Sequence, residues 1–390
     1  MPAMTALTSR SPHDRSTPGP RVVRVVRVSE LLAGARDVRP LDDAPGKSGA
    51  RLERLRIDGV DLVAKYLDPS LDWTMRASGV LGGPMPTLWT SGILHRLPDC
   101  LNQPIIGVAT ADATVDPGEP GDAGATGDAG ATGDAGRAGG ARRRDPNRPR
   151  PNGPGTVLLM HDVGADLIPA TDEPLPLATH LRLLEHMAAM HAAFWGGGSE
   201  IEVVPVMHRY LELSPWTAMA ESAIGSTHLV PQLIGRGWPL LAQVAPAAAA
   251  VVTPLAWDPG PLVQALAATP QTFVHGNWKL DNLGTDPAGR TIVLDWEMPG
   301  RGAPLSDLAW YLAINCRRLP QSKESAMQAY RVALENLGID TSPWWDRQLA
   351  LSLLGALVQF GWEKAFGGYD DELAWWEDKA VSGERVLSSF

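Results

Sequence analysis

The first part of the chain alternates apolar and polar residues in the pattern of β-strands. Within residues 38–67, residues 51–57 alternate with period two and are followed by an Asp-Gly pair, which is a hairpin signal. Residues 61–67 form an apolar run that contains one lysine, Lys65. A lysine inside an apolar strand is costly unless its charge is paired. The pattern therefore predicts a small antiparallel sheet with Lys65 in one of its strands.

Two further apolar runs, residues 105–110 and 156–160, have the length and composition of strands. Between them residues 112–154 break the pattern, with glycine at every third position from Gly121 to Gly139. The tract has the collagen period but is short and lacks proline at the other two positions, so a flexible loop is the simpler interpretation. We expect this insert at the tip of a hairpin of the sheet, where insertions are tolerated.

Beyond residue 160 the apolar residues recur at helical spacing. Residues 178–195 have an apolar face of this kind and carry His180, His186 and His191. These histidines are six and five positions apart, which does not suit metal binding on one helix, so we expect packing or capping roles for them. The predicted strands come first along the chain and the predicted helices follow them, which indicates an α+β fold. Further helices are expected at residues 207–213, 217–224, 230–244, 260–268, 325–337, 346–361 and 370–386.

Length and composition add a domain organisation to this pattern. A chain of 390 residues with 44% hydrophobic residues can bury a large core and is long enough for two lobes. We expect a disordered leader at residues 1–20, because this stretch is polar and rich in proline. Residues 21–160, with the disordered insert 112–154, are expected to form an N-lobe, and residues 161–390 a helical C-lobe.

Charge and cysteine content exclude several classes of protein. The net charge of −10 and the isoelectric point near 5.4 argue against a nucleic-acid partner, which would require a basic surface. Cys100 and Cys316 are far apart and in no metal or redox spacing, which favours a reducing compartment. The first 20 residues lack a signal-peptide core, and the apolar run at 245–255 is too short to cross a bilayer. We therefore expect a cytoplasmic protein without a membrane partner.

The candidate chemistry is concentrated in residues 272–312. A β-branched run ending at Asp295 follows a turn, and Asn282 precedes that turn, so a tight hairpin would bring the two side chains together. An amide oxygen and a carboxylate are hard ligands suited to Mg²⁺ that carries a nucleotide phosphate. Trp278 and Trp296 are expected to pack beneath the two loops.

These residues resemble the motifs of the aminoglycoside phosphotransferase and choline kinase family, relatives of the protein kinases. His275, Gly276 and Asn282 match the family's His-Gly-Asp-x-x-x-x-Asn, Asp295 matches its metal-binding aspartate, and Asp307 opens its downstream Asp-Leu-Ala. The resemblance implies a bilobal protein-kinase-like α+β fold, with a small antiparallel β-sheet in the N-lobe and a mainly helical C-lobe. It also implies ATP and Mg²⁺ as cofactors, with Asn282 and Asp295 as metal ligands.

The resemblance also assigns nucleotide contacts in the N-lobe. Lys65 matches the lysine that grips the α- and β-phosphates in kinase-like folds. Residues 44–49 contain a Gly-Lys-Ser triplet but not the P-loop spacing, because position 41 is Leu41. They form either a flexible turn between strands or a hairpin that covers the nucleotide, in which case Ser48 and Gly49 would contact it.

One position departs from the family pattern, because Asn277 stands where the family has its catalytic aspartate. An amide can orient a hydroxyl but cannot accept its proton, and loss of a general base typically costs ~10²–10⁴-fold in rate. Lys279 could neutralise the moving phosphoryl group, and Asp281 is a candidate substitute for the missing carboxylate.

Two further residues are expected to support the site rather than to react. His275 would tie the catalytic loop to the metal-site strand, and Asp307 would brace that loop and cap the helix that follows. The partner of Lys65 is open, because residues 68–97 contain no glutamate and Asp72 is the only nearby carboxylate, so the lysine is either paired with Asp72 or paired elsewhere.

The expected function is ATP-dependent phosphoryl transfer to a hydroxyl of a small molecule, such as an aminoglycoside, an amino sugar or a choline-like compound. The alternative is a catalytically impaired pseudokinase that serves as a nucleotide- or ligand-binding module. Residues 369–378 combine acidic and aromatic side chains, which suits either a cationic ligand or an amphipathic helix with a solvated acidic face.

Overall fold

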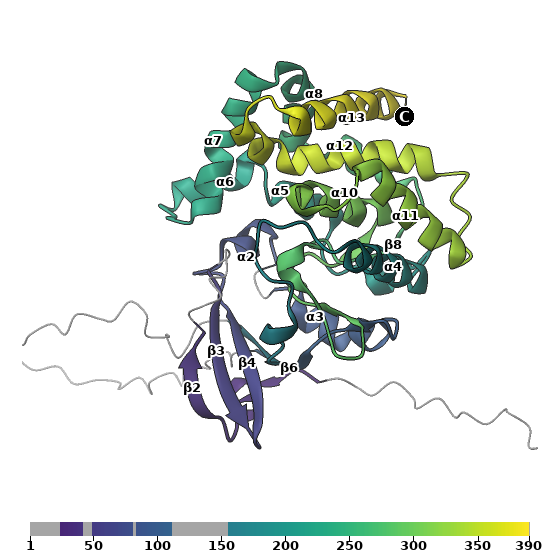
Figure 1. The fold of residues 1–390 in the computed structure, drawn as a ribbon. Helices are drawn as coiled ribbons and strands as arrows, with labels where there is room; N and C mark the ends of the chain where they lie inside the picture. Colours follow the sequence, from purple (N-terminus) through teal and green to yellow (C-terminus); the bar gives the residue numbers. More distant parts are fainter. Residues whose placement is uncertain (1–23, 42–48, 81–82, 111–154, 390) are drawn as a thin grey trace, which may run out of the picture.

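The computed structural model describes residues 24–41, 49–80, 83–110 and 155–389. The expected leader at 1–20, the insert at 112–154 and Ser48 lie outside the described residues. Figure 1 shows a sheet with two short helices at one end of the molecule and a larger helical body at the other. The predicted α+β fold, with a small antiparallel sheet in an N-lobe and a mainly helical C-lobe, is confirmed.

Six strands form the sheet of the N-lobe in the order β1-β6-β7-β4-β3-β2. All neighbours are antiparallel except β1 and β6. The strands are β1 (Val26–Arg27), β2 (Arg36–Pro40), β3 (Arg51–Ile57), β4 (Val60–Leu67), β6 (Ile105–Thr110) and β7 (Thr156–His161).

The sheet places Lys65 in a central strand. The β3–β4 hairpin turns at Asp58 and Gly59, whose φ angles of 50° and 83° are the positive values that a tight two-residue hairpin turn needs. Lys65 of β4 then lies between Leu52 of β3 and Leu158 of β7. The strands predicted from the alternating pattern are therefore confirmed, and the lysine is fixed by hydrogen-bonded neighbours on both sides.

The ends of β6 and β7 show where the insert leaves the sheet. Thr110 and Thr156 are paired residues of adjacent antiparallel strands. The expected position of the insert between two neighbouring strands is confirmed.

Ten α-helices build the described C-lobe. One of them, α12 (Trp345–Lys364), is buried along most of its length and forms the centre of the lobe. It packs against α7, α8, α10 and α13. The others are α4 (Leu177–Ala193), α5 (Val206–Leu211), α6 (Pro215–Ala223), α7 (Leu229–Val244), α8 (Pro246–Trp257), α9 (Gly260–Ala267), α10 (Pro304–Ile314), α11 (Lys323–Asn336) and α13 (Asp371–Ser388).

Each helix expected from the apolar spacing is present, and within the described C-lobe α8 is the helix that was missed. Its two prolines obscured the pattern, although Pro246 stands in the first turn, where no intrahelical N–H bond is lost, and Pro254 lies in the last turn. None of the helices in the described part of the chain combines the length and the apolar character needed to cross a bilayer.

Short strands connect the two lobes. β10 (Thr291–Val293) pairs with β9 (Leu283–Thr285) and with β5 (Leu101–Asn102), and β5 precedes the insert in the chain. β8 (Thr272–Val274) pairs with β11 (Gly300–Gly302). Two helices of the N-lobe, α2 (Trp73–Ala77) and α3 (Met85–Thr90), contribute to the hydrophobic core that continues into the helical body. The residues on either side of segment 275–299 are thus held together by the pairing of β8 with β11.

The paired ends of β6 and β7 predict that the insert is dispensable for stability. We expect replacement of residues 111–154 by a four-residue Gly/Asn turn to leave the free energy of unfolding unchanged, or to raise it by up to ~2 kcal/mol, because a shorter loop costs less closure entropy. Urea unfolding of the two proteins measures this. A loss of several kcal/mol would contradict the prediction.

Candidate active site

The β9–β10 hairpin brings Asn282 and Asp295 to the same end of two paired strands. Leu283 pairs with Val293, and one step further the Leu294 N–H donates to the Asn282 carbonyl at 2.9 Å. At the other end of the hairpin, the Asp286 carboxylate accepts from backbone N–H groups of the turn and closes it. The predicted hairpin is confirmed, and a contact between the Asn282 amide and the Asp295 carboxylate stays a prediction.

Lys65 lies against the carboxylates that follow β10. Its Nζ donates to Asp295 Oδ1 at 2.5 Å and to Glu297 Oε1 at 3.0 Å. Asp295 adopts a φ of 59°, a left-handed value that is uncommon for a residue with a side chain and that is often found at functional sites. Between the two carboxylates, Trp296 is buried, and its ring centroid lies 4.5 Å from that of His275 in a tilted arrangement. An alternating Asp-Trp-Glu segment therefore directs both acids towards the lysine and anchors its tryptophan in the core.

The charges of this cluster stabilise one another. Burial alone would lower the pKa of Lys65, but the Asp295 and Glu297 carboxylates raise it above its ordinary value, so the ammonium stays charged. Burial opposes ionisation of Asp295, and the adjacent Lys65 and Lys279 charges nevertheless hold its pKa below the ordinary range. The pKa of Glu297 is raised, mainly by burial and by the neighbouring Asp295. Lys65 and Asp295 therefore form an ion pair that joins the sheet to the helical body.

The partner of Lys65 thus comes from the C-lobe and not from residues 68–97. Asp72, the other carboxylate considered from the sequence, is buried and caps α2 instead, where its Oδ1 accepts from the Thr74 and Met75 N–H groups. The interpretation that the lysine is paired elsewhere is confirmed.

Asp307 braces the catalytic loop, as predicted. Its Oδ2 accepts from the His275 N–H at 2.7 Å, and its Oδ1 accepts from the Gly276 N–H at 2.8 Å. His191 of α4 lies 3.2 Å from the same Oδ2. The prediction that Asp307 also caps α10 is wrong, because the residue lies in the first turn and the cap position is Ala303, which makes no side-chain bond. The carboxylate is directed to the loop instead of to the N-terminus of its own helix.

His275 ties its loop to the end of β10 and stays neutral. Its Nε2 lies 3.0 Å from the Leu294 carbonyl, and its Nδ1 accepts from the Asn277 N–H at 3.1 Å. These two bonds require the neutral tautomer with hydrogen on Nε2. Burial lowers the pKa of His275 to about 4, although Asp307 acts in the opposite direction. The predicted structural role of this histidine fits its bonds.

Gly276 is required by the packing of the same loop. Its φ is 75°, and a Cβ on it would lie 2.1 Å from the Met298 carbonyl oxygen. No other residue fits this conformation and this approach.

Asn277 is buried and lies on the loop between His275 and Asn282. Among the described residues no hydrogen bond involves its side-chain amide, and its carbonyl accepts from Asn282 Nδ2 at 3.1 Å. That bond turns the Asn282 amide oxygen away from the loop. Lys279 acts electrostatically on Asp295, whereas Asp281 is exposed on the 3₁₀ turn Leu280–Asn282. The structure therefore brings Lys65, Asn282 and Asp295 together with the loop that carries Asn277.

On the N-lobe side, Gly49 is the one described residue of the predicted covering turn. A Cβ on it would lie 2.6 Å from the Leu71 carbonyl and 2.8 Å from a ring carbon of His228. Gly49 thus packs closely against two other segments, and a contact with a nucleotide stays a prediction.

The sequence interpretation missed Glu212 as a member of this site. Glu212 follows α5 and is 9% exposed, and among the described residues no hydrogen bond or ion pair involves its carboxylate. Burial, together with Glu297 and Asp72, raises its pKa to about 8, although Lys279 acts in the opposite direction. Glu212 lies in the sequence between α4 and the loop that carries Asn277, and it has no fixed spacing from any of the motifs. The sequence pattern therefore could not identify it. Glu297, in contrast, could have been found from the alternation of the Asp-Trp-Glu segment.

The donor set suits a hard divalent cation. Asp295 and Glu297 offer carboxylate oxygens, and Asn282 offers an amide oxygen at the end of the paired hairpin. Over the described ranges, no cluster of three or more His, Cys, Asp or Glu residues is arranged to hold a metal ion. The fit therefore depends on the amide of Asn282 in addition to the two acids.

The acidic and aromatic segment at 369–378 holds a cation of the chain itself. Lys323 Nζ lies 4.7 Å from the centroid of the Trp375 ring and bonds to Glu372 at 2.5 Å, and Trp376 is buried. This arrangement favours the amphipathic-helix interpretation of α13 over a site for a cationic ligand.

A comparison with protein families matches the segment of the chain that carries the motifs. Residues 230–339 match the model of the phosphotransferase enzyme family. The resemblance to this family is confirmed. The matched span contains the catalytic loop, the β9–β10 hairpin and Asp307. Comparison with curated proteins found no match.

Several solved structures are similar over most of the chain at low identity. One is a thermostable mutant of aminoglycoside phosphotransferase APH(4)-Ia in its apo form (14% identity, 93% of this chain and 98% of that one, TM-score 0.42). A second is choline kinase LicA from Streptococcus pneumoniae (13% identity, 93% and 96%, TM-score 0.43). A third is the microcompartment-associated aminopropanol kinase (14% identity, 91% and 93%, TM-score 0.45).

The hydrogen bonds of Asp307 predict a large stability effect. Asp307→Ala leaves two buried backbone donors without an acceptor, and each such loss costs ~1–3 kcal/mol, so we expect the free energy of unfolding to fall by about 3–5 kcal/mol. Urea unfolding measures the change. Asp378→Ala, on an exposed side chain of α13, is the control and should stay within ~0.5 kcal/mol of wild type. Equal stability of the two variants would show that Asp307 does not brace the loop.

The buried carboxyl of Glu212 predicts a pH-dependent stability. Its pKa in the folded chain is raised to about 8 from an ordinary 4.5, so the folded state resists ionisation. The resulting cost is absent below pH 4.5 and grows as the pH rises to 8. We expect Glu212→Gln to be more stable than wild type at pH 8 by on the order of 1–3 kcal/mol, with a smaller difference at pH 5.

Urea unfolding at the two pH values, in buffer with EDTA, tests this expectation. Glu185→Gln, on an exposed glutamate of α4, is the matched control and should show no such pH dependence. A difference between Glu212→Gln and wild type that is the same at both pH values would be inconsistent with a raised pKa.

Proposed function

We propose that this protein is an ATP- and Mg²⁺-dependent phosphotransferase that acts on a hydroxyl of a small molecule, with its nucleotide between the lobes. The observation that carries the proposal is the contact of Lys65 with Asp295 and Glu297. It places a fixed cation from the sheet beside two carboxylates from the helical body. Phosphoryl transfer depends mainly on such positioning and charge neutralisation.

Each residue of the cluster has a role in this proposal. Lys65 would bind phosphate oxygens of ATP, and Asn282, Asp295 and Glu297 would hold Mg²⁺ through oxygen atoms. When bound, the metal ion supplies positive charge that offsets the charge of the phosphates. His275 and Asp307 keep the loop and the hairpin in register so that these ligands stay in place.

The acceptor would approach the catalytic loop at Asn277. Its side-chain oxygen can accept a hydrogen bond from the acceptor hydroxyl and orient it, and Lys279 can offset negative charge on the transferred group. The transition state of phosphoryl transfer is loose, so the hydroxyl needs little help from a base before attack. Slow turnover is therefore compatible with an amide at this position.

A pseudokinase that binds nucleotide without turnover is the second candidate function. It is favoured by one observation, the amide of Asn277 in place of the carboxylate that the family motif carries. In this case Lys65, Asn282 and Asp295 would still bind Mg²⁺·ATP.

A coupled assay of ADP release distinguishes the two functions. The full chain is tested with Mg²⁺·ATP against aminoglycosides, amino sugars, choline and simple sugars, and we expect turnover with at least one acceptor. Asp295→Ala should abolish it, because the metal loses a ligand. Asn277→Asp should raise kcat by ~10–10³-fold if a base is limiting.

The possible results of this assay decide between the enzyme and the binding module. If no acceptor gives turnover and calorimetry shows binding of Mg²⁺·ATP, the result supports the binding module and rejects the enzyme. Turnover that persists in Asp295→Ala, or the absence of any Mg²⁺·ATP binding, contradicts both functions.

A further inference from the structure

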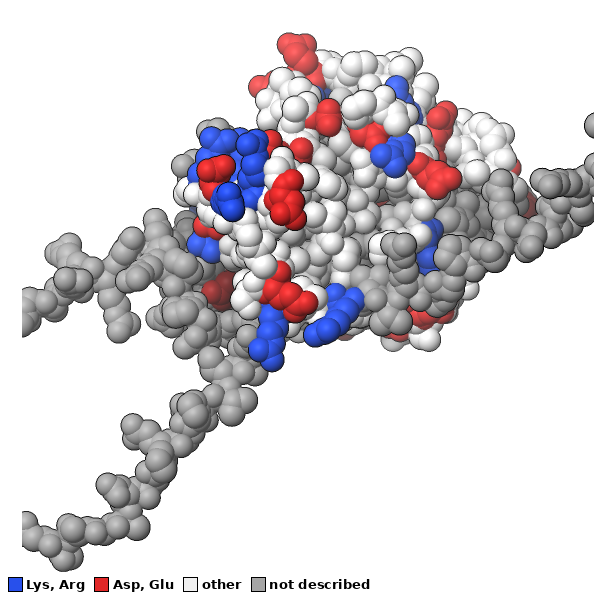
Figure 2. All heavy atoms as spheres, turned by 90° about the horizontal axis from the view of Figure 1, so that it is seen from below, with Lys and Arg blue, Asp and Glu red and all other residues white. Residues whose placement is uncertain are grey.

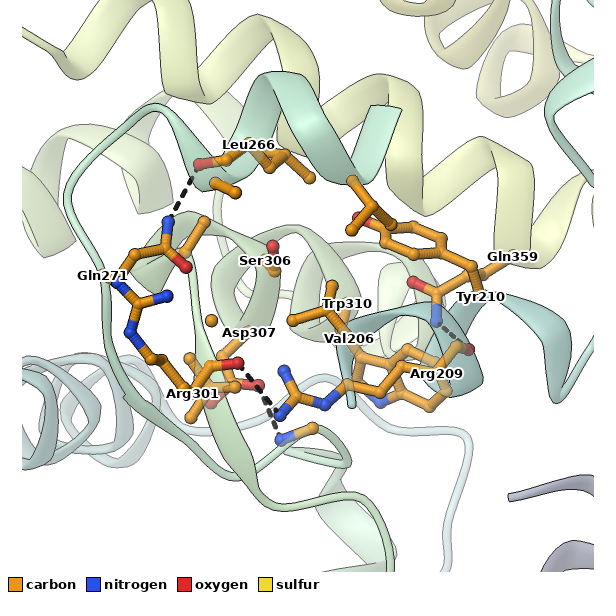
Figure 3. A pocket seen from close by; sticks show the side chains of 16 residues that line it. Val206, Arg209, Tyr210, Leu266, Gln271, Arg301, Ser306, Asp307, Trp310 and Gln359 are labelled. Atoms are coloured by element: carbon orange, nitrogen blue, oxygen red, sulfur yellow. Dashed lines mark hydrogen bonds between the residues drawn. The ribbon is translucent and has the colours of Figure 1, made fainter. Parts of the chain in front are cut away.

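A second candidate site lies in the helical lobe behind the catalytic loop. A cavity of about 70 Å³ is lined by residues of α5, α9, α10, α12 and β11 (Figure 3). Gly276 of the catalytic loop forms part of its wall. Arg209 and Arg301 line it, and Asp307 is the only acid among its lining residues. The cavity therefore has an excess of positive charge.

Arg209 is a buried cation that forms no ion pair with another described residue. It is 7% exposed, and its Nε is buried without any hydrogen bond in the described structure. Its Nη2 makes two long bonds, to the carbonyls of Val204 at 3.3 Å and Arg301 at 3.4 Å. Burial lowers the pKa of Arg209 to about 10, partly offset by Asp307, so the guanidinium is still charged at neutral pH. A buried charge of this kind is costly unless an anion pairs with it.

Asp307 is not available to pair with Arg209. Its two oxygens already accept from the His275 and Gly276 N–H groups and contact His191. It offsets some of the charge at a distance, but no ion pair between it and Arg209 is formed in the described structure.

The backbone of β11 is shaped around the guanidinium. A Cβ on Gly302 would lie 2.7 Å from Arg209 Nη1, and one on Gly300 would lie 2.9 Å from Arg209 Nη2. Arg301, between these glycines, donates from Nε to the Gly197 carbonyl at 3.1 Å, and its guanidinium lies along another side of the cavity (Figure 3). Two glycines thus make room for a charged group with which no described side chain forms an ion pair.

We propose that this cavity binds a small oxyanion, a phosphate or carboxylate group, between Arg209 and Arg301. Guanidinium groups present paired N–H donors whose geometry matches such anions. Ser306 lines the same cavity and offers a hydroxyl (Figure 3). A volume of about 70 Å³ admits several water molecules and so has room for one oxyanion group. The site is separate from Lys65 and does not rest on the proposed phosphotransferase function.

Calorimetry and thermal unfolding of the full chain, without nucleotide or Mg²⁺, test this proposal. The probes are inorganic phosphate and acetate, with 3-phosphoglycerate and glycerate to represent the same groups on a larger molecule. We expect at least one probe to bind and to raise Tm, and Arg209→Met to weaken its Kd by tenfold or more. Arg301→Met should weaken it to a smaller extent.

Three further variants complete the design. Gly302→Ala crowds Arg209 Nη1 and should also weaken binding, which preserves the test if Arg209→Met does not fold. Arg236→Met, on an exposed arginine of α7, is the matched control for loss of a positive charge and should leave Kd unchanged. Lys65→Met should also leave Kd unchanged, because the nucleotide site is elsewhere.

The outcomes separate the sources of the anion. In both supporting outcomes the binding depends on Arg209. Binding of phosphate or acetate then supports a site for a free anion. Binding of the larger probes alone supports a site for the anionic group of a metabolite. The proposal is overturned if no probe binds, or if folded Arg209→Met binds as well as wild type. Loss of binding in Lys65→Met with retention in Arg209→Met would assign the anion to the nucleotide site instead.

Discussion

The contact between Lys65 and Asp295 is the interaction on which the rest of the arrangement depends. It joins a central strand of the sheet to the strand end that would carry the metal ligand, across 230 positions of sequence. Both groups are buried enough for their charges to matter, because an unpaired lysine or aspartate in such a place would be strongly destabilising. The pair therefore ties the two lobes together and fixes a buried cation beside an anion.

The contact between Lys65 and Asp295 is supported by neighbouring residues that bond mainly to backbone groups. Asp307 holds the loop through two N–H groups, His275 connects the loop to the carbonyl before Asp295, and Gly276 allows the close approach. Asp307 also lies in the wall of the cavity that contains Arg209. A single buried carboxylate thus lies between the loop that carries Asn277 and the cavity that contains Arg209.

Much of this was predictable because it depends on local patterns. Period-two alternation identified the strands around Lys65, and a β-branched run after a turn identified the hairpin that joins Asn282 to Asp295. The rest depends on tertiary contacts. The carboxylate of Asp307 could as well cap a helix as brace a loop, and only the fold decides. Glu212 and Arg209 come from an irregularly spaced helical region, so nothing in their sequence positions links them to the motifs.

The central claim is that Lys65 and the acids opposite it hold Mg²⁺·ATP. Its most direct test is calorimetric titration of ATP into wild type and Lys65→Met, each with Mg²⁺ and with EDTA. The account predicts binding by wild type that requires Mg²⁺ and that weakens by tenfold or more in Lys65→Met. Binding of equal strength in the folded variant, or binding by wild type that is indifferent to Mg²⁺, would contradict it.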